Sequence, residues 1–407
     1  MTAAPADDVL FLSQRVPHPP DRGDRISTYH FLRHLRESGV RVRVGCLAED
    51  ERDLAAVEEL RGMVAEVAAP RIAPRRAKLL SLRGLVTGEP LTLPYFRNRA
   101  LQRTVDRWIR EAPPRLVFVY SSSMAQYVLA HDELCRVMHF CELDSDKWRQ
   151  YAARSGALGR FVYGREHREL LRFETEVARR FDASVVISDV EKELFERCIP
   201  GVVPHVVPNG VDVDHFTSSG DTAREDATVV FTGVMDYEPN VDGVLWFARD
   251  CWPAIRAEFP AARFLVVGNR PVPAIRALDG EHGIHVTGWV ESTPPWFDRA
   301  RVAIAPLRLA RGLQNKVLEA MSMGLPVVAS PQAAQGLGAV DDDTLWVRPD
   351  APAITDAVLE LLRDPARARD VGTRAARFVR ERFRWENMFE RLDAVFAAAL
   401  ASRGATR

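Results

Sequence analysis

The sequence has few cysteines, little net charge and no long apolar run, and each shortage excludes a class of protein. Its five cysteines are odd in number and form no C-x-x-C pair, which argues against a disulfide framework and predicts a reduced, cytoplasmic setting. A formal net charge of -1 argues against a nucleic-acid partner, because such binding needs a concentrated positive surface. No apolar run reaches about 18 residues, so no membrane span is expected. The opening MTAAPADDVLFLSQ lacks the basic start of a signal peptide.

Several catalytic motifs are also missing. The sequence contains no G-x-x-x-x-G-K-[ST], no H-E-x-x-H, no G-x-S-x-G and no G-x-G-x-x-G after a strand. P-loop phosphoryl transfer, zinc hydrolysis and serine hydrolysis therefore lose their usual sequence support.

What the sequence does have is a regular alternation of short β-branched runs with longer helical patterns. This alternation predicts an α/β fold of doubly wound parallel sheets covered by helices on both faces. A chain of 407 residues suits two such domains of about 200 residues each. The predicted strands are residues 9–14, 42–47, 64–69, 116–121, 135–140 and 184–189, then 228–233, 263–268, 284–288, 301–307 and 326–330. A polar spacer within residues 207–226 marks the change of domain.

The strongest chemical signal lies in residues 306–330, PLRLARGLQNKVLEAMSMGLPVVAS. Helical spacing predicts a helix that Gly312 opens and a Gly-x-Pro closes. The N-terminus of such a helix attracts anions, and Arg308 and Lys316 flank it. Glu319 lies about one turn deeper, where a carboxylate can accept bonds from a ribose diol. In the alternative interpretation Lys316 and Glu319 are an ordinary surface pair.

This run resembles the signature of the GT-B glycosyltransferases called family 4, a large retaining group. The family pattern is Glu, seven residues, Glu, then A-x-x-x-G-x-P-V-V, and Glu319 matches the second Glu, which binds the nucleotide ribose. The first Glu, which touches the transferred sugar, would fall at Arg311, and this difference leaves the donor sugar open. The stretch G-x-Q-N-K-V-L-E-A-M is similar to an exosortase/PEP-CTERM-associated branch linked to exopolysaccharide synthesis.

The resemblance implies a GT-B fold, two Rossmann-like domains that face a central cleft. Residues 1–206 would bind the acceptor and residues 207–382 the nucleotide-sugar donor, while residues 383–407 would form a helix that returns to the first domain. A simple helical cap on the second domain is the alternative for that helix. The implied reaction moves a sugar from a nucleotide-diphosphate sugar to a hydroxyl with retention. It implies no cofactor and no metal, because fixed cations and a helix dipole can stabilise the departing diphosphate.

Further donor contacts are implied at glycine-containing turns that follow predicted strands. Many family members clamp the diphosphate with an Arg and a Lys where this chain has Val234 and Asn240, so Arg308 and Lys316 would carry that role. The implied donor-binding residues are Gly23, Asn209, Gly210, Gly233, Gly288, Arg308, Gly312, Lys316 and Glu319.

The run VMHFCELDSDKWRQYA follows a strand and supplies the catalytic candidates His139 and Asp144. Family 4 enzymes often place a His or an acid hereabouts, near the anomeric carbon. A lone His late in a buried strand is also a common core residue, so that alternative stays open for His139.

Basic residues gather in the first half, and four of them are candidates for contact with the acceptor or a membrane: Arg22, Arg75, Arg76 and Lys78. Leucines interleave with the cations in residues 72–86, as in segments that rest on anionic lipid. The hypothesis is therefore a sugar or lipid-linked saccharide acceptor, with peripheral contact at the inner face of the membrane. The alternatives are a solvated loop at Arg22 and a helix whose leucines pack inward.

Two other functions remain compatible with these features. A nucleotide-sugar epimerase or hydrolase can share the fold, and a degenerate chain can bind nucleotide sugar without turnover. The nucleotide base, the sugar, the acceptor and the linkage are not indicated by the sequence.

Overall fold

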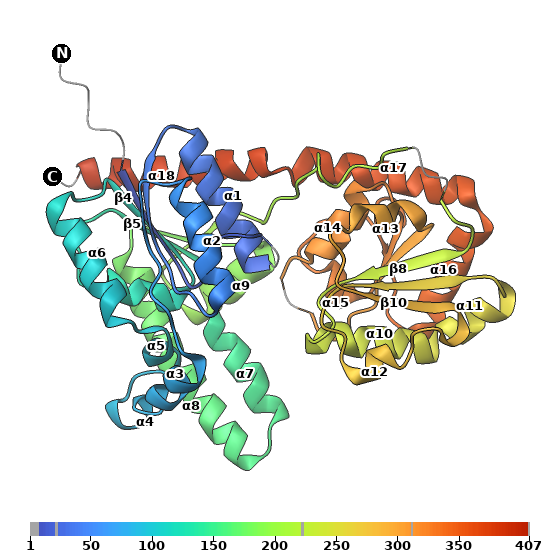
Figure 1. Cartoon of the computed structure of the whole chain (residues 1–407), viewed down its shortest axis with the longest axis horizontal. Helices are drawn as coiled ribbons and strands as arrows, with labels where there is room; N and C mark the ends of the chain where they lie inside the picture. The colour runs from blue at the N-terminus through green and yellow to red at the C-terminus, as the bar shows by residue number, and fades with distance from the viewer. Residues whose placement is uncertain (1–7, 21–22, 221–223, 311, 406–407) are drawn as a thin grey trace. The chain divides into compact units, whose positions relative to one another are not determined.

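The computed structural model describes residues 8–20, 23–220, 224–310 and 312–405 (Figure 1). The chain divides into two compact units. The first comprises Met1–Val207 together with Phe389–Arg407, and the second comprises Pro208–Met388. Arg22 and Arg311, which the sequence analysis singled out, lie outside the described residues.

The first unit is built on a seven-stranded parallel sheet of order β3-β2-β1-β4-β5-β6-β7. Its strands are β1 (Asp8–Ser13), β2 (Arg41–Gly45), β3 (Glu66–Ala68), β4 (Leu116–Tyr120), β5 (Arg136–Cys141), β6 (Ala183–Val186) and β7 (His205–Val206). Its helices are α1 (Gly23–Glu37), α2 (Glu51–Arg61), α3 (Pro74–Ser81), α4 (Gly84–Thr87), α5 (Thr92–Phe96), α6 (Arg99–Glu111), α7 (Asp144–Arg154), α8 (Ala157–Arg180) and α9 (Asp189–Cys198), with a 3₁₀ helix at Ser122–Tyr127.

The second unit is built on a six-stranded parallel sheet of order β10-β9-β8-β11-β12-β13. Its strands are β8 (Thr228–Thr232), β9 (Arg263–Val267), β10 (Ile284–Gly288), β11 (Val302–Ala305), β12 (Val327–Ala329) and β13 (Trp346–Val347). Its helices are α10 (Glu238–Asp250), α11 (Trp252–Glu258), α12 (Pro273–Arg276), α13 (Pro294–Arg299), α14 (Asn315–Ser322), α15 (Pro331–Ala334), α16 (Ala351–Arg363) and α17 (Pro365–Arg382), with a 3₁₀ turn at Glu281–Gly283.

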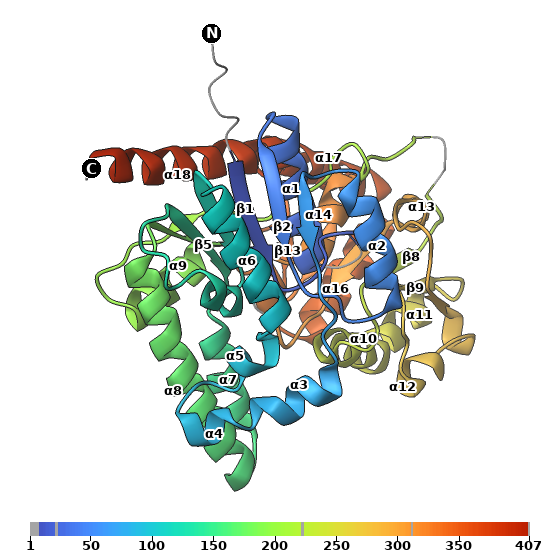
Figure 2. The same ribbon diagram turned by 60° about the vertical axis from the view of Figure 1, so that its left-hand side comes forward.

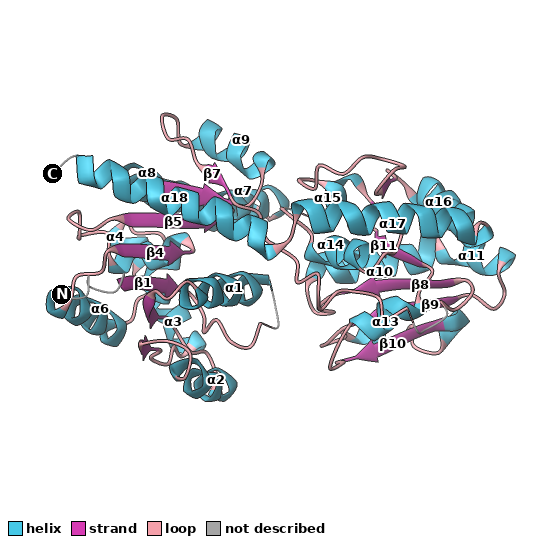
Figure 3. Cartoon of the chain, turned by 90° about the horizontal axis from the view of Figure 1, so that it is seen from above, coloured by secondary structure: helices cyan, strands magenta, loops and turns pink. Residues whose placement is uncertain are grey.

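Helices lie on both sides of each sheet (Figure 3), which confirms the predicted fold class. All five residues of β4 and all five of β8 are buried, as expected for parallel strands that are covered on both faces. All eleven predicted strands are present, and β7 and β13 are additional two-residue strands at the ends of the sheet orders.

Each sheet has a point where the direction of winding reverses. In the first sheet it lies between β1 and β4, and in the second between β8 and β11. Crevices for ligands form outside the carboxyl ends of the strands at such points. A ligand site is therefore expected at the turns that follow β1, β4, β8 and β11.

The last helix, α18 (Trp385–Ala405), packs on the first unit from Phe389 onward, as the fold prediction required. The Phe389 ring stacks on His34 of α1 with centroids 4.2 Å apart, and His34 Nε2 lies 2.9 Å from Asp393 Oδ1. Further along, Phe396 meets Phe118 of β4 edge to face at 5.1 Å. The alternative of a cap on the second unit is wrong for this part of the helix.

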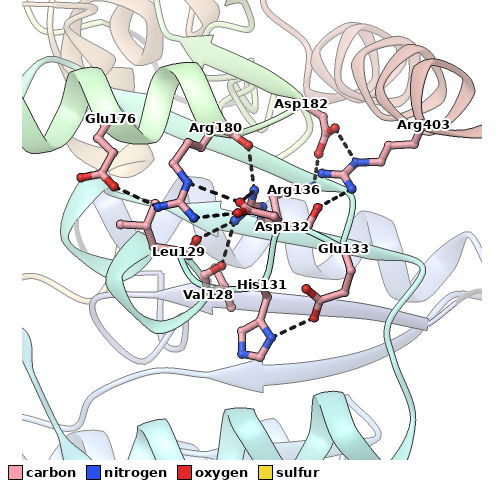
Figure 4. A network of polar contacts seen from close by, with 10 residues as sticks. All are labelled: Val128, Leu129, His131, Asp132, Glu133, Arg136, Glu176, Arg180, Asp182 and Arg403. Carbon is pink, nitrogen blue, oxygen red and sulfur yellow. Dashed lines mark hydrogen bonds and ion pairs between the residues drawn. The ribbon is translucent and has the colours of Figure 1, made fainter. Parts of the chain in front are cut away.

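A network of arginines and carboxylates around the buried Arg136 holds the end of α18 (Figure 4). Arg403 donates to Asp182 Oδ1 at 2.7 Å and to the Asp132 carbonyl at 2.5 Å. Asp182 also accepts the backbone N–H of Arg136, a fully buried residue whose guanidinium reaches Asp132 Oδ1 at 2.7 Å. Arg180 binds the same Asp132 carboxylate at 2.8 Å. Side-chain hydrogen bonds from Arg180 and Arg136 lower the pKa of Asp132 to about 2, so it stays charged.

Candidate active site

Two glycines bring the backbone turns after β8 and β9 into contact. Gly233 follows β8, and its N–H donates to the Val267 carbonyl at 3.0 Å. Gly268 follows β9 with φ +151°, and a Cβ added there would lie 1.7 Å from the Gly233 carbonyl oxygen. Only glycine fits this crossing, so no side chain separates the two turns.

Lys316 enters the space that Gly233 leaves open. Its Nζ donates to Asn240 Oδ1 at 2.5 Å and lies 4.3 Å from the centroid of the Phe231 ring. A Cβ at Gly233 would lie 2.9 Å from this nitrogen. Asn240 is oriented by its own bond to the Val234 carbonyl at 2.9 Å, so an amide holds the ammonium where the family pattern has cations. This partner was missed by the sequence analysis, which treated Asn240 only as a lost charge.

The pKa values of Lys316 and Glu319 both lie near neutral pH. Burial lowers the pKa of Lys316 to about 7, although the charge of Glu319 opposes the shift. Burial likewise raises the pKa of Glu319 to about 7, opposed by Lys316. Among the described residues, no hydrogen-bond donor meets the Glu319 carboxylate. An anion beside Lys316 and hydroxyls beside Glu319 would each favour the charged form, because both supply what burial removed.

Arg308 follows β11 and is already paired with Asp242. Its Nε donates to Asp242 Oδ2 at 2.9 Å, its Nη2 bonds to Asp242 Oδ1, and its guanidinium lies 5.8 Å from the Trp246 ring centroid. Its side chain is 48% exposed, so solvent and ligands can reach it. The phosphate role of Arg308 stays a prediction, and a phosphate there would compete with Asp242, a partner that the sequence did not indicate.

The helix that carries Lys316 begins later than predicted. α14 starts at Asn315 with Gln314 as its N-cap residue, and Gly312 lies in the preceding loop with φ +60°. A left-handed residue cannot open a right-handed helix, so the predicted opening at Gly312 is wrong. The predicted end is confirmed, because Gly324 has φ +69° and Leu325 N–H bonds to the Ala320 carbonyl at 3.1 Å.

The remaining donor candidates in the second unit have different surroundings. A Cβ at Gly210 would lie 2.5 Å from the Trp385 ring, so close packing accounts for this glycine without a ligand. Asn209 precedes it and is partly exposed. Gly288 ends β10 with φ +68°, and a Cβ there would meet no atom within 4 Å. Donor contact at Asn209, Gly210 and Gly288 stays a prediction, and the open space favours Gly288.

In the first unit, Gly23 begins α1 in the loop after β1, where a Cβ would meet nothing within 4 Å. Arg25, two residues later, is 7% exposed and bonds to Asp53 Oδ1 at 2.5 Å. Gly23 therefore leaves room at this edge of the sheet, whereas Arg25 is committed to holding α1 against α2.

His139 lies in the core of the first unit, not on its surface. It is 0% exposed on β5, its ring is 4.9 Å from Tyr120 and 5.5 Å from Phe31, and its Nδ1 accepts the Cys141 N–H at 3.1 Å. Burial lowers its pKa to about 3, so the ring is neutral. This burial is what the core alternative expects, and the catalytic role of His139 stays a prediction.

Asp144 opens α7 and belongs to a small acidic cluster. Its Oδ2 accepts the Ser122 hydroxyl at 3.4 Å. Beside it, Glu174 of α8 is 0% exposed and accepts the Ser145 N–H at 3.4 Å. Burial, then the charge of Asp144, raises the pKa of Glu174 to about 8. From the sequence, Glu174 was interpreted as a structural residue, and its place beside Asp144 was not predicted, because only the fold shows the α7–α8 hairpin that brings the two together.

The basic candidates Arg75, Arg76 and Lys78 are all exposed on α3. The helix buries Ala77 and Ser81 instead of its leucines, so the alternative with inward-packed leucines is wrong. Among the described residues, no group of three or more His, Cys, Asp and Glu side chains is arranged to hold a metal ion. In the same part of the chain, every helix is too short or too polar to cross a bilayer.

Two family models match the chain. Residues 23–210 match the glycosyl transferase 4-like domain, and residues 226–364 match the glycosyl transferases group 1. With the two parallel-sheet units, these matches show that the chain belongs to the GT-B glycosyltransferases.

The curated relatives are mannosyltransferases. The chain is 27% identical over 232 residues to a phosphatidyl-myo-inositol mannosyltransferase of Propionibacterium freudenreichii, and the match covers 54% of this chain and 57% of that protein. It is 31% identical over 131 residues to the protein of the same name from Mycobacterium tuberculosis, covering 30% and 34%. The chain thus spans about half the length of the first relative and a third of the second.

Solved structures share the fold across nearly the whole chain. Sucrose-phosphate synthase from Thermosynechococcus elongatus superposes with a TM-score of 0.74 at 18% identity, covering 97% of this chain and all of that one. Anabaena HepE in complex with UDP superposes with a TM-score of 0.66 at 14% identity, covering 96% and 99%. At these identities the likeness concerns the fold alone.

Proposed function

We propose that this protein transfers a sugar from a nucleotide-diphosphate sugar to a hydroxyl acceptor, with retention at the anomeric carbon and without a metal or other cofactor. The observation that carries the proposal is Lys316, held by Asn240 in the space beside Gly233, with Glu319 close by. These residues lie at the switch point of the second sheet, where the fold favours a ligand.

Each residue has a separate part in this mechanism. Lys316 binds the diphosphate and neutralises the charge that develops on it as the glycosidic bond breaks. Glu319 accepts hydrogen bonds from the ribose hydroxyls. Arg308 exchanges Asp242 for a phosphate oxygen, and the start of α14 adds its dipole. A charge-assisted bond of this kind is worth about 1.5–3 kcal/mol where water is excluded.

The acceptor is proposed to be a saccharide or a lipid-linked saccharide bound by the first unit. The curated relatives are named for a phospholipid acceptor, and the basic residues Arg75, Arg76 and Lys78 face solvent, where an anionic lipid could approach. The resemblance in residues 306–330 supports a role in exopolysaccharide or related glycoconjugate synthesis, with peripheral contact at the inner face of the membrane.

The proposal is tested by thermal shift with a panel of nucleoside diphosphates and their sugars, followed by product analysis with the donor that binds. Bound ligand raises apparent stability by mass action, so weak donors are detected at high concentration. We expect transfer to a saccharide acceptor with the donor's anomeric configuration retained. Faster formation of an epimer or a free sugar would identify an epimerase or hydrolase, and binding without turnover would identify a non-catalytic protein.

Glu319→Ala supplies the site-specific control for that panel. Loss of the carboxylate is expected to weaken the binding of the nucleoside, the nucleoside diphosphate and the nucleotide sugar alike, because all three carry the ribose. Equal calorimetric affinity in the variant and the wild type would remove Glu319 from the site.

A further inference from the structure

The exposed apolar side chains of this protein are concentrated in two short segments. Eight of the twelve large apolar side chains that are exposed among the described residues lie in residues 79–86 and 151–161. Single exposed apolar residues are normal on protein surfaces, but a gathering of this kind marks an interaction site.

The first segment exposes the side chains that a soluble helix would bury. Leu79 is 69% exposed, Leu82 50% and Val86 91%, whereas the small residues Ala77 and Ser81 face the protein. These exposed side chains do not stabilise the isolated protein, because the hydrophobic free energy comes only from apolar surface that is removed from water.

The second segment is the turn between α7 and α8. Leu158 is 79% exposed and Phe161 67%, both in the first turns of α8 beyond that connection. Trp148, Tyr151 and Tyr163 of the same two helices form an aromatic group, in which Trp148 and Tyr163 stack at 5.5 Å and Tyr151 meets Tyr163 edge to face at 5.9 Å. Trp148 and Tyr163 lie further from the turn along their helices than Leu158 and Phe161, which matches the order of groups across a membrane interface.

The two segments lie at the same end of the first unit. Arg165 of α8 donates to the Gly84 carbonyl at 2.6 Å and to the Glu89 carbonyl at 3.2 Å, which ties the segment containing α4 to α8. Glu166 accepts the N–H groups of Leu91 and Thr92 at 2.5 and 2.9 Å. Figures 1 and 2, seen from directions 60° apart, both show α3, α4 and the α7–α8 turn at the lower end of this unit.

The two segments themselves are rich in cations, although Glu89 and Asp146 border them, and Arg71 pairs with Glu51 and Arg149 with Asp146. Residues 71–88 contain five Arg or Lys and no Asp or Glu, and residues 147–165 repeat that count. Among the described residues, Arg75, Arg76, Lys78 and Arg83 have no acidic partner. A second copy of the same face would be repelled by this charge, whereas an anionic lipid surface would attract it.

We propose that α3, α4 and the α7–α8 turn form one membrane-docking surface, which inserts its leucines, Val86 and Phe161 into an anionic bilayer. This rests on the peripheral membrane contact in the proposed function, and it adds the α7–α8 turn, an insertion element outside the basic segment. The cations bind lipid headgroups, the apolar side chains enter the acyl region, and the aromatic group lies at the boundary.

The test is flotation of the full chain with vesicles of phosphatidylcholine alone and of phosphatidylcholine mixed with phosphatidylglycerol. Two paired variants probe insertion, Leu158→Ser with Phe161→Ser and Leu85→Ser with Val86→Ser. The matched control is Val203→Ser with Val340→Ser, since Val203 is 68% and Val340 59% exposed outside these segments. All six residues are exposed, so melting temperature and nucleotide-induced thermal shift should stay at wild-type values.

We expect the wild type and the control to float only with the anionic vesicles. Each insertion variant should partition at least about tenfold more weakly, because it loses two apolar side chains. Flotation of both variants at the wild-type level, or no flotation of the wild type at low salt, would overturn the proposal. A concentration-dependent dimer that either insertion variant abolishes would instead assign the surface to contact between copies. Vesicle binding needs no nucleotide, so these results are independent of transferase activity.

Discussion

At the residue scale, the position of Lys316 combines two opposing requirements. Its amine lies against the Phe231 ring and one neutral amide, Asn240, so burial disfavours its charge. A phosphate needs that charge. The free protein therefore holds Lys316 near its titration midpoint at neutral pH, and ligand binding must be coupled to protonation.

This coupling predicts proton uptake when a diphosphate binds. With the pKa of Lys316 at about 7, most free protein carries a neutral amine near pH 8, and a bound diphosphate would restore the charge. Affinity should fall as the pH rises from 7 to 9. Calorimetry near pH 8, in buffers of different ionisation enthalpy, should show net uptake in the wild type and none in Lys316→Met.

The same variant separates phosphate from nucleoside recognition. Lys316→Met should lower the affinity for nucleoside diphosphates by about 10- to 100-fold, equivalent to one charge-assisted bond of about 1.5–3 kcal/mol. The affinity for a nucleoside without phosphate should be unchanged. An equal loss for both ligands, or a wild-type affinity independent of pH in this range, would contradict the phosphate role.

His139, in the core of the first unit, is a second group whose pKa is shifted by burial. Its pKa is about 3 in the folded protein and about 6.5 in an unfolded chain. Below pH 6.5 the unfolded chain binds the additional proton, so this group's contribution to stability falls as the pH falls toward 3. Between pH 7 and pH 5 the loss amounts to about 2 kcal/mol.

His139→Phe should remove that acid sensitivity. Urea unfolding at pH 7 and pH 5 should show the wild type losing about 2 kcal/mol more than the variant over this interval. A core role further predicts that the variant retains sugar transfer, since the Phe ring keeps the packing against Tyr120 and Phe31. Parallel pH profiles together with abolished transfer would favour the catalytic interpretation.

At the element scale, α18 depends on polar contacts at its far end as well as on its apolar face. Arg403 joins it to Asp182 and Asp132, which the buried Arg136 holds in turn (Figure 4). Arg403→Leu should destabilise the protein by about 1 kcal/mol and speed amide exchange in the last turns of α18. Arg391→Leu, an exposed position on the same helix, is the control. Identical exchange in the two variants would show that apolar packing alone holds the helix.

Elements were predictable where a pattern repeats over several residues. Buried parallel strands such as β4 and β8 are continuous apolar runs, and they were found from the sequence. The strands β7 and β13 have two residues each, too few to show a period. The start of α14 was misplaced because helical spacing does not reveal the left-handed backbone of Gly312.

The candidate site was predictable only along the chain. Helical spacing correctly put Lys316 and Glu319 within one turn of α14. Their surroundings come from other elements, since Asn240 and Asp242 reach Lys316 and Arg308 from α10. No local pattern specifies such contacts. The exposure of the α3 leucines could not be predicted either, because helical spacing alone does not say which face of a helix packs.

At the scale of the whole molecule, the two units divide the proposed work. The proposed phosphate and ribose contacts Arg308, Lys316 and Glu319 all belong to the unit Pro208–Met388, which has its own sheet, core and switch point. The exposed docking surface and Asp144 belong to the other unit. Because each unit has an independent core, a ligand held by one need not order the backbone of the other.

Hydrogen exchange with and without a nucleoside diphosphate tests that division. Mass action should slow exchange after β8, after β11 and in the first turn of α14, whereas β1, β4 and β5 should keep their rates. Glu319→Ala at the same ligand concentration should reduce the protection, since fewer molecules are occupied. Equal protection in both units would mean that the first unit contributes to donor binding directly, and the donor contacts would then have to be sought at Gly23 and the acidic cluster beside Asp144.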